Sequence, residues 1–185
     1  AGRNITTGAS NVVIGSEAQR DENVTGTVTI GTRAGLYNSG GDNTFVGNEA
    51  GRNSGAGTDQ VIIGHDAGYY ATHDDVVIIG ESAGYYATGS GNVFIGKSAG
   101  QGNQAVPPYS SGQYNVAIGH QALTAFTTGE SNVAVGREAG HDITTGTGNT
   151  LVGNAAGDKI TTAEYNVALG AGALGAMAAD ADDNT

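Results

Sequence analysis

The chain has 185 residues, including 33 Gly and no Cys, and its 7 basic and 18 acidic residues give a formal net charge of −11. This composition excludes a collagen, which needs Gly at every third position, and a disulfide-stapled domain. It also excludes a helical bundle, because each interior Gly costs about 1 kcal/mol relative to Ala. The acidic balance argues against a nucleic-acid partner, which requires a basic footprint. No stretch is apolar enough to predict insertion into a membrane.

An internal repeat of 16–17 residues extends over residues 1–175 and leaves an acidic C-terminal tail at residues 176–185. Each copy contains a Gly preceded by Ile, Val or Leu, and an Ala lies three residues after that Gly in every copy. Repeats of this kind predict a stack in which each turn buries the apolar face of the next. The repeat therefore predicts an all-β parallel β-solenoid of about ten turns. Its anchor glycines are Gly15, Gly31, Gly47, Gly64, Gly80, Gly96, Gly119, Gly136, Gly153 and Gly170.

The three residues before each anchor glycine predict a short strand. Its first and third residues, usually Val and then Ile or Val, lie on one face because side chains alternate along a strand. The middle residue lies on the other face and is also mostly apolar, as in Phe45, Ile62 and Phe94. Since both faces require burial, we expect one to fill the coil and the other to face a partner chain. A monomer would then leave the middle column facing water.

Three further columns of the repeat have a physical interpretation. Asn stands four residues before seven of the anchors and predicts a ladder of side-chain amides. The anchor Gly predicts a tight corner, and the Ala three residues later predicts a crowded inner corner. Ten residues before the anchor, a column of Tyr, Phe and Ile predicts a second short element, as at Tyr86, Phe126 and Ile143. Aligning this column places every length change between the Ala and the second element.

The largest length change is an insertion of seven residues within Gln101–Pro108, which contains both prolines of the chain. Because loops on a rigid scaffold often carry binding, this corner is the candidate receptor-contact loop, with a tolerated bulge as the alternative. Its candidate contact residues are Gln101, Asn103, Gln104, Val106, Pro107, Pro108 and Tyr109.

Several patterns resemble sites of chemistry but are explained by the repeat. Residues 91–98 match the letters of a phosphate-binding P-loop, yet the repeat makes their centre a strand instead of a loop before a helix. His65 and His120 share the position after the anchor, and we expect them to be solvated instead of meeting at a threefold axis to bind metal. The Tyr column indicates packing more than sugar stacking. The sequence thus predicts no enzyme, cofactor or metal site.

Two kinds of repeat resemble this one. Residues 115–122 (Asn-Val-Ala-Ile-Gly-His-Gln-Ala) look like the head repeat of trimeric autotransporter adhesins. Residues 43–51 and 149–157 resemble more closely the Gly/Asn-rich repeats of bacteriophage tail-fibre and tail-spike proteins. The resemblance implies a left-handed parallel β-roll in an intertwined homotrimer. It also implies a C-terminal chaperone that cuts itself off, so that residues 182–185 would be a mature terminus.

The sequence thus predicts a structural and adhesive segment of a phage tail fibre, located in the virion, that attaches to a glycan or protein on the host surface. A bacterial trimeric adhesin head, located at the cell surface, is the first alternative. An ice-binding solenoid, which needs a regular array of exposed Thr, is the second. A glycan depolymerase, which needs paired carboxylates in a groove, is the third.

Overall fold

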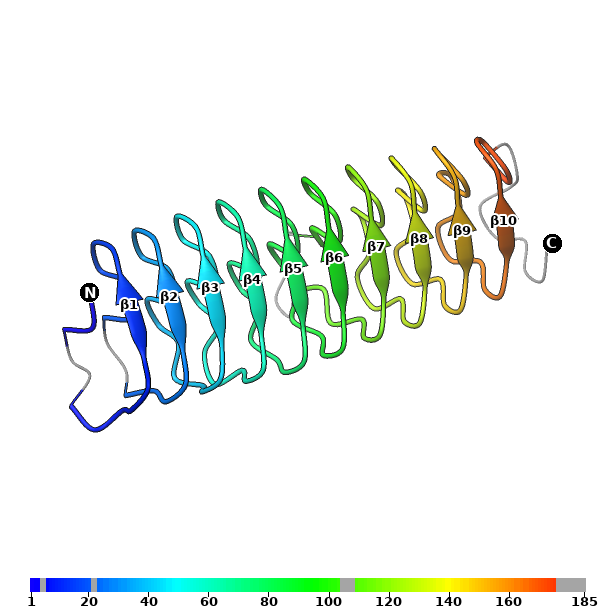
Figure 1. Cartoon of the computed structure of the whole chain (residues 1–185). Helices are drawn as coiled ribbons and strands as arrows, with labels where there is room; N and C mark the ends of the chain where they lie inside the picture. Colours follow the sequence, from blue (N-terminus) through cyan, green and yellow to red (C-terminus); the bar gives the residue numbers. More distant parts are fainter. Residues whose placement is uncertain (4–5, 21–22, 104–108, 176–185) are drawn as a thin grey trace.

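The structure is a computed structural model that describes residues 1–3, 6–20, 23–103 and 109–175, and it is a coil in which every turn contributes one strand (Figure 1). All ten strands are three residues long and form one parallel sheet in which each strand pairs with its sequence neighbours. The prediction of an all-β parallel solenoid is confirmed, with every strand at its predicted place; the acidic tail lies outside the described residues. The strands are β1 (Val12–Ile14), β2 (Val28–Ile30), β3 (Thr44–Val46), β4 (Val61–Ile63), β5 (Val77–Ile79), β6 (Val93–Ile95), β7 (Val116–Ile118), β8 (Val133–Val135), β9 (Thr150–Val152) and β10 (Val167–Leu169).

The register keeps equal positions of the repeat side by side along the whole sheet. The first residue of each strand pairs with the first residue of the next strand, from Val12 with Val28 to Thr150 with Val167. Even the 23-residue spacing between β6 and β7 leaves Val93 opposite Val116. The insertion is therefore absorbed away from the strands, and the sheet remains continuous past it.

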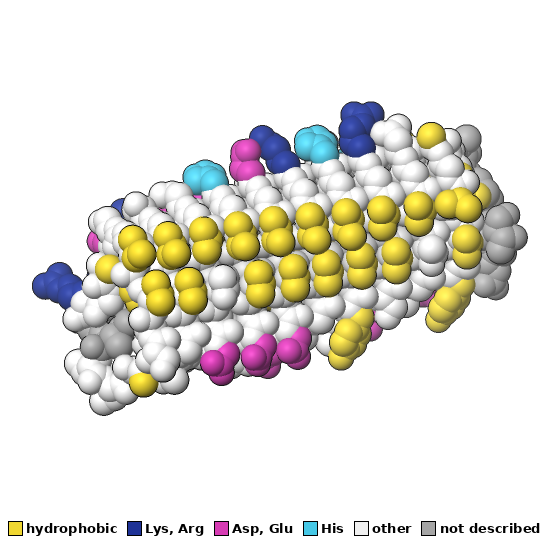
Figure 2. Space-filling view, viewed as in Figure 1, with side chains coloured by type: hydrophobic (Ala, Val, Ile, Leu, Met, Phe, Trp, Pro, Cys, Tyr) yellow, Lys and Arg dark blue, Asp and Glu magenta, His cyan; other side chains and the backbone are white. Residues whose placement is uncertain are grey.

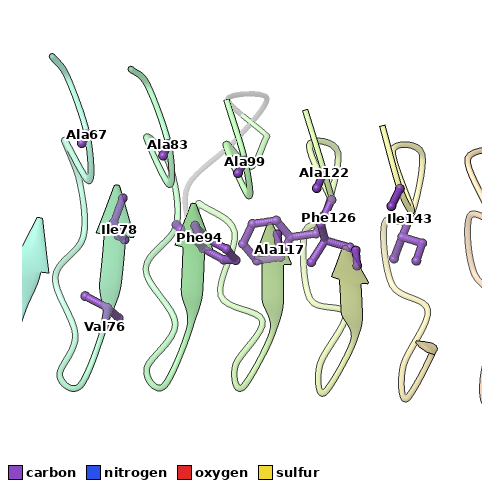
Figure 3. Close-up of a cluster of buried hydrophobic side chains, with 14 of the residues drawn as sticks. Ala67, Val76, Ile78, Ala83, Phe94, Ala99, Ala117, Ala122, Phe126 and Ile143 are labelled. Carbon is purple, nitrogen blue, oxygen red and sulfur yellow. The ribbon is translucent and has the colours of Figure 1, made fainter. Parts of the chain in front are cut away.

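The middle residue of each strand points into the coil, and the two flanking residues point outward. From β2 to β8 the middle residue is buried while both neighbours are half-buried. Figure 3 shows Ile78, Phe94 and Ala117 in the cluster of buried side chains that also contains Phe126 and Ile143. The expectation that the middle column would be the one left facing water is therefore wrong. The chain turns so that this column is enclosed, and the two flanking columns form the outer face.

The interior changes character along the coil. In the later turns it is apolar: Phe94 lies 5.4 Å from Phe126 between ring centroids, and Ile143 and Leu151 are fully buried. In the early turns buried polar side chains share it with apolar ones such as Leu36 and Phe45. The Gln19 amide nitrogen donates to the Asn38 carbonyl at 2.6 Å, and the Ser54 hydroxyl donates to the Asn38 side-chain oxygen at 3.2 Å. These buried amides are tolerated because they satisfy one another.

The predicted amide ladder is present inside the coil. From Asn115 to Asn149, each Asn side-chain oxygen accepts a bond from the backbone N–H of the equivalent Asn one turn later. The Asn132 N–H donates to Asn115, the Asn149 N–H to Asn132 and the Asn166 N–H to Asn149, each at 3.0 Å. The side-chain nitrogen donates to the preceding side-chain oxygen and to a loop carbonyl, such as Gly146 for Asn132 at 2.8 Å. The ladder satisfies polar groups that the strands leave unpaired.

The corner predictions are confirmed as well. Every anchor glycine has a φ between 122° and 141°, a region that L side chains rarely adopt. The Ala three residues later is fully buried in the first nine copies and partly buried in the last, Ala173.

The second element is present, but its predicted alignment is wrong. The residues that line the coil beside Phe126 and Ile143 are Ala71, Ala87 and Ser110, since Ala87 forms a bridge with Ser110. The tyrosines stand one position earlier. The Tyr86 N–H donates to the Gln101 carbonyl at 2.8 Å, as the Ala125 N–H does to the His141 carbonyl at 3.1 Å. Single-residue length changes therefore fall after the second element, and only the seven-residue insertion precedes it.

Candidate functional site

The candidate receptor-contact loop leaves the coil between β6 and β7. Gln101 is half-buried, Asn103 is exposed, and the Asn103 N–H donates to the Ser110 hydroxyl at 2.8 Å. The same hydroxyl donates to the Phe126 carbonyl at 2.6 Å, so Ser110 connects the base of the loop to the next turn. The other predicted contact residues except Tyr109, namely Gln104, Val106, Pro107 and Pro108, lie outside the described residues.

Tyr109 belongs to a tyrosine cluster on the turns that carry β4, β5 and β6. Its ring centroid lies 4.7 Å from that of Tyr70 and 5.5 Å from that of Tyr86. Tyr69 stacks on Tyr85 at 4.8 Å with nearly parallel rings. Tyr69 is buried and the other four are half-buried. The insertion thus ends by placing an aromatic ring over two turns that precede it, which joins the candidate loop to an aromatic surface.

Burial and nearby charge change the acidity of this cluster. Desolvation, together with the negative charge of Asp66, raises the pKa of Tyr85 to about 12. Desolvation also raises the pKa of Tyr70 and of Tyr86. The phenols therefore stay neutral, with hydroxyl groups that can donate and accept hydrogen bonds at one end of an apolar ring.

One cation borders the tyrosine cluster. The Arg52 guanidinium lies 5.2 Å from the centroid of Tyr69 and 5.7 Å from that of Tyr37, both within cation–π range. It also lies 3.8 Å from the Glu49 carboxylate. The tyrosine cluster does not follow from the predicted column, which contains one tyrosine per turn and leaves out Tyr69 and Tyr85. The segment Gly-Tyr-Tyr-Ala, at residues 68–71 and 84–87, was the signal that could have revealed it.

A second candidate surface is the outer face of the sheet (Figure 2). Two parallel rows of apolar side chains run along it: Ile14 to Leu169 in the row before the anchors, and Val12 to Val167 in the other. Only Thr44 and Thr150 interrupt the second row. Nine intervals of about 4.8 Å make this face roughly 43 Å long. Single soluble chains rarely expose a continuous apolar surface of this extent, so it indicates a contact surface.

Two rims border the outer face. The acidic rim comprises Asp42, Asp59, Asp75, Tyr114 and Tyr165, which stand two residues before their strands. The basic rim comprises His65, Glu81, Lys97, His120 and Arg137, which directly follow the anchor glycines. Figure 2 shows these two sets of side chains on opposite sides of the apolar rows. Both cations of the basic rim are paired within the chain: the Lys97 ammonium lies 3.0 Å from the Glu81 carboxylate, and the Arg137 guanidinium lies 3.1 Å from the Glu138 carboxylate.

Two residues of the acidic rim have a strained backbone. Tyr114 has a φ of 58° and Tyr165 a φ of 57°. Asp tolerates this left-handed region, but a bulky residue there costs about 1–2 kcal/mol. Both tyrosines are largely exposed, at 64% and 59%. Each ring lies over a glycine of the preceding turn: a Cβ on Gly91 would come within 2.6 Å of Tyr114, and one on Gly148 within 2.7 Å of Tyr165.

The patterns that resembled chemical sites are placed as follows. The centre of the P-loop-like segment is β6, and Gly96 is the anchor that follows it. His65 and His120 are exposed and stand three turns apart. Among the residues that the structure describes, no three His, Asp or Glu side chains gather in a way that could hold a metal ion. That part of the chain also contains no helix of a length and apolarity suited to crossing a membrane.

The fold and the outer face define the class of the chain, a parallel β-solenoid with one exposed apolar sheet. Comparison with known proteins finds no matching family model, no matching curated protein and no matching solved structure.

Proposed function

We propose that the chain is a segment of a homotrimeric phage tail fibre, part of the virion, that stiffens the fibre and attaches it to the host surface. The observation that carries this proposal is the outer sheet face, whose two apolar rows extend over all ten strands and are interrupted only at Thr44 and Thr150. Three copies that turned this face toward a common axis would shield it from water. The left-handed coil and intertwined chains belong to the same proposal, by resemblance to the fibre repeats.

The composition of the face also ranks the alternatives. An ice-binding surface needs a regular array of exposed Thr, whereas the outer face carries Val, Ile and Leu with only two Thr. Exposed Thr recur in register at Thr128, Thr145 and Thr162, which is three turns only. An adhesin head of a bacterial surface protein would use the same apolar face in the same manner, and it remains the second candidate.

We expect the wild-type chain to have a solution mass about three times its 18.3 kDa, in a form that resists heating in detergent. Ile79→Glu places a charge in the middle of the outer face, where its side chain is half-buried. In the separate chain this glutamate points to water, but in the trimer it is desolvated without a partner, which is strongly unfavourable. Light scattering should therefore find the variant as a monomer.

The matched control is Thr128→Glu, which introduces the same charge at an exposed position outside the strands. It should leave the mass of the trimer unchanged. A wild-type chain that is monomeric at every accessible concentration would refute the fibre proposal.

Attachment to the host is assigned to the tyrosine cluster and the loop that ends in it. Tyrosine offers a large rigid ring and a hydroxyl at low entropic cost, a combination suited to recognition. Three copies per fibre would repeat each weak contact, and linked contacts gain affinity through effective concentration. The surroundings are acidic, since Asp66 and Glu49 lie nearby, which favours a neutral glycan or a protein over an anionic one.

Replacing Tyr86 and Tyr109 together by Ser should weaken binding to bacterial cells and to arrayed cell-surface glycans by tenfold or more, because both rings lie at the insertion corner. The control is Tyr37→Ser, which removes an equally placed tyrosine that lies outside the cluster and is 45% exposed. The control should bind as the wild type does. Equal losses in the two variants, or no loss in either, would remove this surface from the proposal.

A further inference from the structure

Two exposed tyrosines of the acidic rim are explained neither by packing nor by the backbone. Tyr114 and Tyr165 leave 64% and 59% of their surface exposed, so neither ring fills the coil. Both have a left-handed φ, which the Asp and Ser residues at the same position of other turns adopt at lower cost. Strained conformations of this kind persist where a function selects them. A contact outside the chain is the use that remains for these two rings.

The backbone holds both rings in fixed positions. The Tyr114 N–H donates to the Ser90 carbonyl at 3.1 Å. The Tyr165 N–H likewise donates to the Thr147 carbonyl at 3.0 Å. Each ring also lies against a glycine of the preceding turn, where any Cβ would meet it. Because the chain already supports one side of each ring, little conformational entropy is lost when a ligand contacts the other side.

The surface between the two rings carries small and polar side chains. The tyrosines stand three turns apart, which is about 14 Å along the rod. The two turns between them have Ser131 and Gly148 at the same position, with Glu130 exposed and Thr147 half-buried beside them. Two carboxylates and no basic residue are found in the four corner segments, which are residues 112–115, 129–132, 146–149 and 163–166. The rings thus flank a stretch that offers hydrogen-bond acceptors and no positive charge.

These features match the chemistry of a neutral oligosaccharide in an extended conformation. One face of a pyranose ring presents C–H groups that pack on an aromatic ring, while its hydroxyls donate to carboxylate and hydroxyl oxygens. An acidic glycan is disfavoured, because its negative groups would face Glu130 without a cation to pair with in the four segments. Since the two rings are further apart than the width of one sugar, only a chain of several sugars can reach both.

We propose that Tyr114, Tyr165 and the small residues between them form a glycan-binding surface for a neutral oligosaccharide that lies along the rod. The two rings pack on sugars at the ends of the bound segment, and Glu130 accepts hydrogen bonds from hydroxyls between them. Two linked weak contacts gain affinity through effective concentration. This surface is separate from the tyrosine cluster, and it needs no second copy because one chain supplies both rings.

A glycan array with neutral and acidic glycans of graded length tests the proposal. We expect the wild-type chain to retain neutral oligosaccharides and to retain neither monosaccharides nor acidic glycans. In calorimetric titration with the best-retained oligosaccharide, Tyr114→Ser and Tyr165→Ser should each weaken binding roughly tenfold or more, because one of two linked contacts is lost. The double variant should show no binding. Both variants should fold, since Ser131 adopts the same backbone conformation with a φ of 56°.

Asp59→Ser is the matched control, because it changes an exposed left-handed residue of the same rim without removing a ring. It should bind the oligosaccharide as the wild type does, and so should the monomeric Ile79→Glu chain and the double variant of the tyrosine cluster. A wild-type monomer that binds through both rim tyrosines would support this inference while refuting the fibre proposal.

Three results would overturn the inference. The first is a wild-type chain that retains no neutral oligosaccharide. The second is oligosaccharide binding that persists in the double variant of Tyr114 and Tyr165. The third is a peptide array on which these two tyrosines are required for capture while no glycan depends on them, since the surface would then bind protein.

Discussion

Gly119→Ala should lower the free energy of unfolding by about 4 kcal/mol, among the largest effects of any single substitution. Gly119 has a φ of 135°, and a Cβ built on it would lie 2.4 Å from the Gly136 carbonyl oxygen in the next turn. The backbone of Gly136 cannot retreat, because its N–H donates to the Ile118 carbonyl at 2.8 Å. Thermal or denaturant unfolding of the variant measures the loss.

Gly170→Ala separates the two causes of this effect. Gly170 has the same type of backbone, with a φ of 122°, but a Cβ there would meet nothing within 4 Å. It should therefore cost only the conformational strain, about 1–3 kcal/mol. If the two variants lost equal stability, the close approach of successive anchors would not matter, and the account of the corner would be wrong.

Asn132→Ala should be the second most damaging change, with a loss of about 3–4 kcal/mol. Asn132 is fully buried, and its side chain bonds to the Asn115 side chain, the Gly146 carbonyl and both the N–H and the side chain of Asn149. Removing it leaves several buried polar groups without a partner, each at a cost of about 1–3 kcal/mol, partly offset by relaxation. The amide proton of Asn149 should also exchange faster with solvent.

Asn154→Ala is the matched control, since it removes the same side chain from an exposed position. Its oxygen accepts a bond from the Arg137 guanidinium at 3.0 Å in a solvated setting. Its loss should stay within about 0.5 kcal/mol, as for other surface changes. Equal losses from the two variants would mean that the amide ladder adds nothing beyond a surface contact.

The strands and corners could be predicted because their residues recur in register, the Gly and the Ala in all ten copies and the Asn in seven. Few conformations satisfy all turns at once when the same residues recur at constant offsets, namely an Asn, an apolar triplet, a Gly and an Ala. The seven-residue insertion could also be located, since it changes one spacing only. The tyrosine cluster could not be predicted from the repeat, because ring contacts between turns depend on which side chains of neighbouring turns lie at the same height along the rod.

The sequence by itself determined the solenoid, its ten strands, the amide ladder and the tight glycine corners, because these depend on local offsets that repeat. Only the tertiary structure decided which strand face is interior. Both faces are apolar, and the alternation of side chains along a strand does not show which face is interior. The corners decide this, because they turn the chain to one side. The three-dimensional hydrogen bonding likewise decided that tyrosines such as Tyr86 stand one position before the buried column. Counted forward from the Ala, the buried residue of the second element stands at the same position in every turn without the insertion. Counted back from the next anchor, its position varies with the length of each turn.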